Sequence, residues 1–303
     1  MLAKDVITAL IVVTILGSNF VAIKVGLAEL PPLLLTALRF TFAAFPAVLF
    51  VRPPKAPAPA VAAFGLTLGV VQFGLLFVAI RMGMPAGLSS LVIQMQVFFT
   101  LALAYAAFGE KPSRTQLSAG LLAACGIVVI AVHLTRTAPP LPFIMVLGAA
   151  LAWAAANCLV KTLGRVDMLA VMVWGSAAAP IPLVLLSMLI EGPGAIATGM
   201  EHATWRSAVA IAYLAYPTTL FAFALWNGLL SRYPAATVAP FALLVPLVGM
   251  VSTGLMLGEP VDGPDIAGAV LVLIGLAWNM RTGLRGGRSR PETTALDAEG
   301  SPG

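Results

Sequence analysis

The sequence predicts an all-α integral membrane protein of about ten transmembrane helices. Of its 303 residues, 60% are hydrophobic and 10% are charged, and the mean hydropathy is +1.01. A water-soluble domain with this composition would aggregate. Apolar stretches that reach the roughly 20 residues needed to cross a bilayer follow one another along most of the chain. Prolines and charged residues separate these stretches, as expected for loops between spans.

Turn signals divide the chain into ten expected spans. The first apolar stretch is too long for the hydrophobic part of a signal peptide and lacks a convincing cleavage site, so we expect it to remain as a span. The segment Glu191-Gly192-Pro193 is expected to be a loop, like the other Pro-rich and charged breaks. The expected spans are residues 5–28, 33–51, 60–80, 85–108, 117–134, 142–163, 169–190, 207–230, 235–257 and 265–284.

The basic residues favour an orientation with both chain ends in the cytoplasm. If the N-terminus is inside, twelve of the 17 Lys and Arg residues fall on the inner side, while Arg81, Arg136 and Arg206 fall outside. The twelve are Lys4, Arg52, Lys55, Lys111, Arg114, Lys161, Arg165, Arg232, Arg281, Arg285, Arg288 and Arg290. Their spread over short loops argues against a nucleic-acid-binding face, despite a pI near 9.6. We expect a multi-pass protein of a bacterial-type inner membrane; a monomer is compatible with the sequence.

A repeat relates the two halves of the chain. Three motifs recur 149 residues later: Pro85-Ala86 as Pro234-Ala235, Gly109-Glu110 as Gly258-Glu259, and Gly126 as Gly275. We therefore expect a first five-helix repeat over residues 1–136, a second over 137–285, and a tail over 286–303 whose polar composition predicts disorder in the cytoplasm.

The repeat indicates a class of function. Because five is odd, the second copy must cross the membrane in the opposite sense to the first. Inverted repeats of this kind are typical of secondary transporters, in which two halves alternate around a substrate site near the midplane. The sequence therefore predicts a central cavity between the two repeats and transport by alternating access.

Several motifs resemble a known family. They are Leu16-Gly17-Ser18-Asn19-Phe20 followed by Lys24, Leu38-Arg39-Phe40 in the second span, and the two Gly-Glu pairs. Together they resemble the EamA family of the drug/metabolite transporter superfamily over about residues 5 to 284, and within it the YddG-type amino-acid exporters. The resemblance implies export of amino acids or related metabolites from the cytoplasm. The family often has Trp where this chain has Leu16, and Trp153 is a candidate to supply a ring from the other half.

Polar and aromatic side chains within the spans are the candidate substrate contacts. An amide exposed to hydrocarbon is costly, so such residues face the protein interior, where they bind substrate or form helix-to-helix hydrogen bonds. Aromatic rings at similar depth line a cavity or pack. The candidates are Asn19, Gln72, Phe73, Phe77, Gln94, Gln96, Phe99, Trp153, Asn157, Tyr216 and Trp226.

Prolines and a glycine in the fourth and ninth spans are the candidate hinges. Pro85 and Gly87 open the fourth span and Pro240 and Pro246 interrupt the ninth, so these four residues are expected hinges or static kinks.

Lys24 and Arg39 lie within spans toward the outer face. Either could contact a substrate carboxylate, could snorkel to the interface, or, for Lys24, could pair with Glu29. Glu110 and Glu259 are expected to end helices and to form interfacial salt bridges.

The types of charged and polar residues within the spans favour some substrates and argue against others. We expect neutral, aromatic or amphipathic amino acids to be carried without proton coupling, because no acidic residue is expected near the midplane. Sugar phosphates and nucleotide sugars would need more cations than Lys24 and Arg39, and cationic drugs would need an intramembrane acid. A membrane-embedded enzyme would need a catalytic constellation that the spans do not offer. No cofactor or metal is expected, and Cys125 and Cys158 fall in apolar helices as small hydrophobes.

Overall fold

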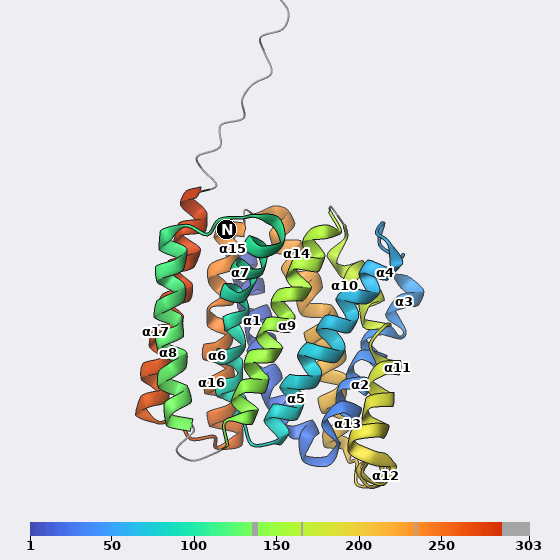
Figure 1. Ribbon diagram of the computed structural model, residues 1–303. Coiled ribbons are helices and arrows are strands. Elements are labelled where there is room, and N and C mark those ends of the chain that lie inside the picture. Colours follow the sequence, from blue (N-terminus) through green and yellow to red (C-terminus); the bar gives the residue numbers. More distant parts are fainter. Residues whose placement is uncertain (135–138, 165, 234, 287–303) are drawn as a thin grey trace, which may run out of the picture.

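The computed structural model describes residues 1–134, 139–164, 166–233 and 235–286, and within these ranges the fold is helical without strands (Figure 1). Ten helices in the described residues are long and apolar enough to cross a membrane, which confirms the predicted fold class. The predicted disordered tail from residue 287 onward, Pro234 of the repeat, and Arg136 and Arg165 lie outside the described residues.

The ten spans agree with the predicted ranges to within a few residues at most ends. They are α1 (Ala3–Glu29); α2 and α3 (Pro32–Ala44, Ala47–Phe50); α4, η1 and α5 (Ala58–Gly65, Leu66–Gln72, Phe73–Arg81); α6, η2 and α7 (Ala86–Val92, Ile93–Met95, Gln96–Phe108); α8 (Arg114–Leu134); α9 (Leu141–Thr162); α10, α11 and η3 (Met168–Ser176, Pro180–Leu186, Ser187–Glu191), continued by α12 (Gly192–Glu201); α13, η4 and α14 (Trp205–Tyr213, Leu214–Phe221, Ala222–Arg232); α15 and α16 (Ala235–Ala242, Leu244–Leu257); and α17 (Gly263–Gly286).

One loop prediction is wrong. The segment Glu191-Gly192-Pro193 was expected to be a loop, but helix α12 begins there. Gly192 takes a positive φ of 83°, which turns the chain sharply. Pro193 then lies in the first turn of α12, where its missing N–H removes no helical hydrogen bond.

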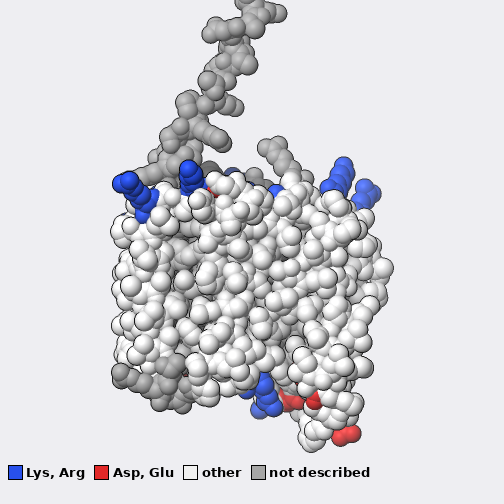
Figure 2. Space-filling model, viewed as in Figure 1, with Lys and Arg blue, Asp and Glu red and all other residues white. Residues whose placement is uncertain are grey.

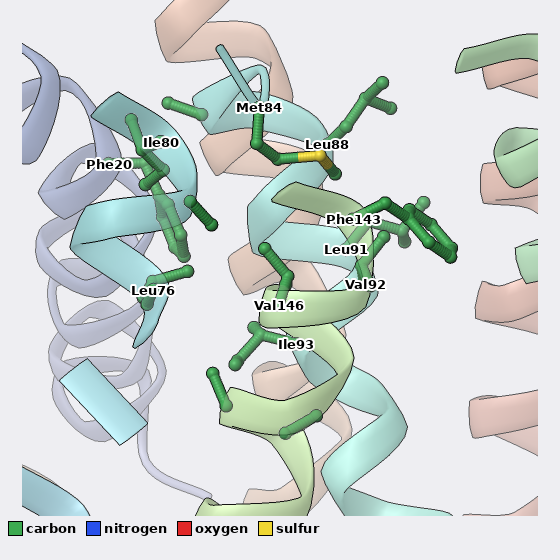
Figure 3. Packing of buried hydrophobic residues seen from close by; sticks show 14 of the residues in the cluster. Phe20, Leu76, Ile80, Met84, Leu88, Leu91, Val92, Ile93, Phe143 and Val146 are labelled. Carbon is green, nitrogen blue, oxygen red and sulfur yellow. The ribbon is translucent and has the colours of Figure 1, made fainter. Parts of the chain in front are cut away.

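The helices form two layers between two flanking pairs. In one layer α9 packs between α7 and α5; in the other α1 packs between α16 and α13. The flanking pairs are α8 with α17 and α2 with α11, at the two edges of the bundle (Figure 1). The core between the layers contains Phe20, Leu76, Ile80, Leu91 and Val146, which point toward one another from α1, α5, α6 and α9 (Figure 3).

Small residues allow the helices to approach closely. A Cβ placed on Gly126 of α8 would lie 2.6 Å from the carbonyl oxygen of Gly268 in α17, and one on Gly268 would lie 2.7 Å from the Gly126 oxygen. Side chains larger than hydrogen cannot occupy this contact. The α8–α17 pair is therefore held at backbone-to-backbone distance.

The two ends of the bundle differ in charge. The N-terminus and the end of α17 lie at one end, here called the terminal face, and the other end is called the distal face (Figure 1). In the view of Figure 2, most Lys and Arg side chains gather at the terminal face. The prediction that both termini are cytoplasmic depends on this uneven distribution of Lys and Arg between the two faces.

Helix irregularities recur at matching positions of the two halves. The fourth span breaks into a short 3-10 turn at Ile93–Met95, and the ninth breaks at Leu243, which is 149 residues after Gln94. The π-helical segments η1 and η4, in the third and eighth spans, begin 148 residues apart. Discontinuous spans and π segments are frequent near the binding sites of transporters. These correspondences support the inferred inverted repeat.

Candidate functional site

A buried arginine lies between the π-helical segments η1 and η4. Arg39 of α2 is 3% exposed and shares a helix face with the buried Thr36, Phe40 and Ala43. Its guanidinium stacks 3.9 Å from the ring centroid of Phe73, directly after η1. Its Nη2 donates a 3.3 Å hydrogen bond to Thr219 Oγ1 in η4. Arg39 therefore does not snorkel toward an interface, as one prediction allowed, because this helix face packs into the bundle.

The arginine and its neighbours have unused hydrogen-bonding capacity. Among the described residues, no partner is present for Arg39 Nε and Nη1 or for either amide atom of Gln72. The same holds for Ser176 Oγ and Thr218 Oγ1, on elements that pack against α2. We use the term arginine cluster for Arg39, its partner Thr219, and the unpartnered Gln72, Ser176 and Thr218 on elements that pack against α2. Unsatisfied buried polar atoms are costly and are most often explained by a ligand or by water.

Aromatic rings enclose the arginine cluster on one side. The guanidinium lies 5.4 Å from the Phe40 centroid and 5.9 Å from that of Phe77. The Phe73 and Phe77 rings meet edge to face at 6.0 Å. Phe73 also packs against three separate hydrophobic clusters, so it stands where these parts of the core meet. Cation–π stacking stabilises a cation in an otherwise apolar setting.

A second polar group lies between α7 and α9. Asn157 Nδ2 donates to Gln96 Oε1 at 2.8 Å and to Thr100 Oγ1 at 3.3 Å. This arrangement is the helix-to-helix bond that was the alternative to substrate contact for Asn157 and Gln96. Both residues are half-buried, so part of each side chain remains accessible. Their role as substrate contacts stays a prediction.

The remaining predicted contacts are distributed over the bundle. Gln94 lies in the 3-10 break of the fourth span, and Asn19 is buried on α1 with its Oδ1 unpartnered among the described residues. Phe99 and Trp153 pack on the main core. Tyr216 lines a separate groove of about 460 Å³ beside α3 and α10, and Trp226 packs near the terminal end of α1. The structure thus brings Phe73 and Phe77 to Arg39 and places Gln72 directly before Phe73, whereas Tyr216 and Trp226 lie elsewhere.

The predicted hinges have different positions in their helices. Pro85 is the N-cap residue and Gly87 lies in the first turn of α6, so neither interrupts the fourth span. Its break lies at Ile93–Met95 instead, without a proline. Pro240 and Pro246 flank the break at Leu243, where a proline removes a helical hydrogen bond. Whether any of the four acts as a hinge stays a prediction.

Glu259 joins three helices at the distal face. After α16 ends, Gly258 adopts a left-handed φ of 65°, and the Glu259 carboxylate accepts hydrogen bonds from the amides of Ala86 and Gly87 at 3.0 and 2.9 Å. It thereby caps α6, where a negative charge is favourable. Lys24 Nζ lies 3.7 Å from the same carboxylate, so Lys24 pairs with Glu259 and not with Glu29.

The corresponding motif lies at the terminal face. Helix α7 ends at Phe108, Gly109 has a φ of 69°, and Glu110 pairs with Lys161 at the end of α9. The residues of this ion pair are about half-exposed. Lys161 and Lys24 thus occupy related places, each bound to the glutamate that follows a left-handed glycine.

Two further carboxylates cap helices at the distal face, and the sequence analysis missed both. Glu191 accepts hydrogen bonds from the amides of Leu33 and Leu34 at the start of α2. Glu29 accepts two from Thr204, the residue before α13. A glutamate at the end of one span gives no sequence signal for a distant helix start, so only the fold reveals these caps.

One group of side chains has the composition of a metal site. The ligand atoms of His133, Asp262 and Asp265 lie within 4.8 Å of one another where α8 meets α17. His133 Nε2 lies 3.1 Å from Asp262 Oδ2, and Asp265 accepts a hydrogen bond from the Asp262 amide at the start of α17. A hydrogen bond between His133 and Asp262 and a cap at the start of α17 account for this arrangement.

Comparison with known proteins places the chain among membrane transporters. The model of the EamA-like transporter family matches residues 3–132 and 141–281. A "Probable amino-acid metabolite efflux pump" of Salmonella typhimurium is 40% identical over 91% of this chain and 95% of its own length, and its Escherichia coli counterpart is 39% identical with the same coverage. A "Probable terminal-alkyne amino-acid exporter" of Streptantibioticus cattleyicolor is 28% identical over 97% of this chain and 98% of its own length. One crystal structure, 19% identical, has a TM-score of 0.63 over 94% of this chain and 98% of that one, which shows the fold alone.

Proposed function

The chain belongs to the EamA-like transporter family and is a multi-pass inner-membrane transporter rather than an enzyme, and we propose that it exports amino acids by alternating access. We further propose that its substrates are neutral, aromatic or amphipathic amino acids, bound in a cavity between the two repeats. The names of the relatives support amino acids and their metabolites as substrates. The positive charge of the terminal face supports a cytoplasmic location for both termini.

The substrate proposal rests on one observation, which is that Arg39 is buried without an acidic partner among the described residues. A cation buried among apolar helices is expensive unless it is paired, and the described residues offer it no carboxylate. Two of its nitrogens are free to donate. A guanidinium presents parallel N–H groups that match a carboxylate, and such charge-assisted bonds are among the strongest in proteins. The carboxylate that every amino acid carries would therefore be the missing partner.

The surroundings of Arg39 suit the rest of an amino acid. The unpartnered amide oxygen of Gln72 and hydroxyl of Thr218 are acceptors for an ammonium group. The rings of Phe73 and Phe77 provide an apolar wall for the side chain. A nucleotide sugar or sugar phosphate would bring more negative charge than one buried guanidinium can match.

The acidic residues support transport without proton coupling. Asp5 pairs with Arg232 at the terminal face, and Glu29, Glu191 and Glu259 bind helix starts at the distal face. These carboxylates lie at span ends, so within the described residues none lies beside Arg39 to relay a proton through the middle of the membrane. Substrate gradients would then drive export.

The test is counterflow of radiolabelled amino acids in proteoliposomes, with Arg39→Met and Arg39→Lys variants and Lys55→Met as the control on the terminal face. Truncating one partner of a buried charge pair costs about 2–5 kcal/mol, so we expect Arg39→Met to lower kcat/KM about thirtyfold or more. Arg39→Lys should recover part of this loss, because it keeps the charge without the planar fork. Each variant is first checked for a monodisperse elution profile and wild-type melting.

Substrate analogues make the test specific. Wild-type protein should prefer an amino acid over its C-terminal amide, and Arg39→Met should lose that preference. An unchanged preference would refute the role of Arg39 but leave amino-acid export standing. Transport of sugar phosphates without amino acids would refute the substrate class, and uphill accumulation driven by an imposed pH gradient would refute uncoupled transport.

A further inference from the structure

A groove of about 870 Å³ runs along the distal half of α1 between α13 and α16. Its floor is formed by α1 residues such as Ser18, Ala22 and Val25, and its walls by Val209 of α13 and Met256 of α16. The lining is mostly apolar. At its inner end, the Ser18 and Tyr213 hydroxyls are 2.6 Å apart, and each also lies within hydrogen-bonding distance of a carbonyl oxygen of α1.

The groove opens toward lipid rather than toward the arginine cluster. On α1, Ile7, Ile11 and Thr14 are exposed and lie on the same helix face as Ser18 and Val25, by the 3.6-residue period. The opposite face of α1 carries Phe20 and Ile23, which belong to the main core and do not line the groove. Val209 and Met256 on the walls are likewise exposed. The groove is therefore part of the bilayer-facing surface.

Basic residues line this groove near the distal face, although most Lys and Arg residues of the molecule lie at the terminal face. Apart from the buried Arg39, three Lys and Arg residues among those described lie toward the distal face: Lys24, Arg81 and Arg206. All three line the groove. Positive charge is otherwise concentrated at the terminal face, so its collection around one distal groove needs a cause other than membrane orientation.

The nearby acids cancel only part of this charge, because Glu29 and Glu259 bring two negative charges against the three cations that line the groove. Glu29 is engaged with the amide and hydroxyl of Thr204. Glu259 is shared between Lys24 and the amides of α6. Arg81 donates to the Leu27 carbonyl, while Arg206 is exposed beside the Trp205 ring. Lys24 and Arg206 thus keep donors that can turn toward an anion, and Trp205 is placed as membrane-interface tryptophans are.

We propose that this groove binds an anionic phospholipid of the leaflet at the distal face. One acyl chain lies along α1 between α13 and α16, and the headgroup phosphate lies between Lys24 and Arg206. Anionic lipids are drawn to such juxtamembrane cations, and basic pockets between transmembrane helices bind their headgroups. The proposal depends on the membrane-spanning fold and is independent of which substrate is carried.

Native mass spectrometry of the full-length protein tests this site, with phosphatidylglycerol and phosphatidylcholine of matched chains titrated separately. Wild-type protein should retain phosphatidylglycerol at least about tenfold more tightly. Each Lys or Arg near an anionic surface is worth about 1 kcal/mol, so Arg206→Gln should weaken this binding about fivefold and the Lys24→Gln/Arg206→Gln double variant about thirtyfold. Lys55→Gln, at the terminal face, is the matched control and should change it less than twofold.

A second variant separates charge from fold. Val25→Trp fills the apolar floor without changing any charge, and should weaken retention of both lipids while leaving the melting temperature near that of wild type. Arg206→Gln also leaves the Lys24–Glu259 pair intact, so weaker lipid binding by this variant cannot come from uncapping α6.

Equal retention of the two lipids by wild-type protein, or wild-type retention by the double variant, would overturn the proposal. Competition by soluble glycerol phosphate at equal concentration would overturn it too, because a phosphate site would then need no lipid.

Discussion

The two Gly-Glu motifs have the same local structure but different surroundings. Gly109 and Gly258 each end a helix with a left-handed residue, and the following glutamate amides bond back to Ala104 and Thr253 at 3.4 Å in both cases. Glu259 is 13% exposed and caps α6, whereas Glu110 is 53% exposed and pairs with Lys161. The same sequence signal thus forms a buried junction at one face and a solvated ion pair at the other.

The packing of the fourth and ninth spans explains this difference. At the distal face α6 packs directly against α16, where Ser90 Oγ donates to the Pro246 carbonyl at 3.3 Å and a Cβ on Gly249 would lie 2.5 Å from Ser90 Oγ. At the terminal face the main partner of α7 is α9, and the main partners of α15 are α1 and α17. The distal junction is therefore the more tightly closed of the two. The alternating access proposed above would require such an inequality between the repeats.

The largest effect should come from crowding the distal junction. A Cβ on Gly87 would lie 2.5 Å from Thr253 Oγ1 and 3.2 Å from the Met250 Cα, so Gly87→Ala must push α6 away from α16. Overpacking of this kind costs about 1–3 kcal/mol of unfolding free energy, measurable by denaturant titration in micelles. Gly254→Ala on α16 is the control, since its Cβ would meet its nearest neighbour at 3.7 Å. Equal stability of the two variants would show that the junction is not tightly packed.

Removal of the two glutamates compares the motifs directly. Glu259→Ala deletes a cap with two amide bonds and should lower the unfolding free energy by about 1–2 kcal/mol. Glu110→Ala breaks a half-exposed pair and should cost less than about 1 kcal/mol. The same titration measures both variants in parallel. A larger loss for Glu110→Ala would place the more important junction at the terminal face and reverse the comparison.

Much of the fold could be predicted because its cause lies in the local sequence. Apolar runs of span length between Pro-rich breaks must form helices in lipid, where each backbone group has to be satisfied within its own segment. The wrong prediction of a loop at Gly192-Pro193 has a local cause as well. The pair both ends one helix and begins the next, and composition alone does not distinguish a loop from a new first turn.

The candidate site was predicted less completely because its members meet only in three dimensions. Arg39 was expected toward the outer face, either as a contact for a substrate carboxylate or snorkelling to the interface. Instead of allowing it to snorkel, the packing of one face of α2 buries it against Phe73 and Thr219. Ser176 and Thr218 carry no signal, since hydroxyl residues in apolar helices commonly bond to their own backbone. The break at Gln94 has no proline to indicate it, and only its register with Leu243 connects it to the ninth span.

The smallest expected effect is a salt dependence that differs between the two motifs. Raising the ionic strength from about 0.1 M to 1 M shortens the Debye length from about 10 Å to 3 Å, which screens exposed charges far more than buried ones. The stability difference between wild type and Glu110→Ala should therefore shrink by a few tenths of a kcal/mol. The difference for Glu259→Ala should persist, because its hydrogen bonds to the Ala86 and Gly87 amides do not depend on a mobile counter-charge. Parallel titrations at the two salt concentrations measure this, and equal salt sensitivity would mean that water reaches Glu259 as freely as Glu110.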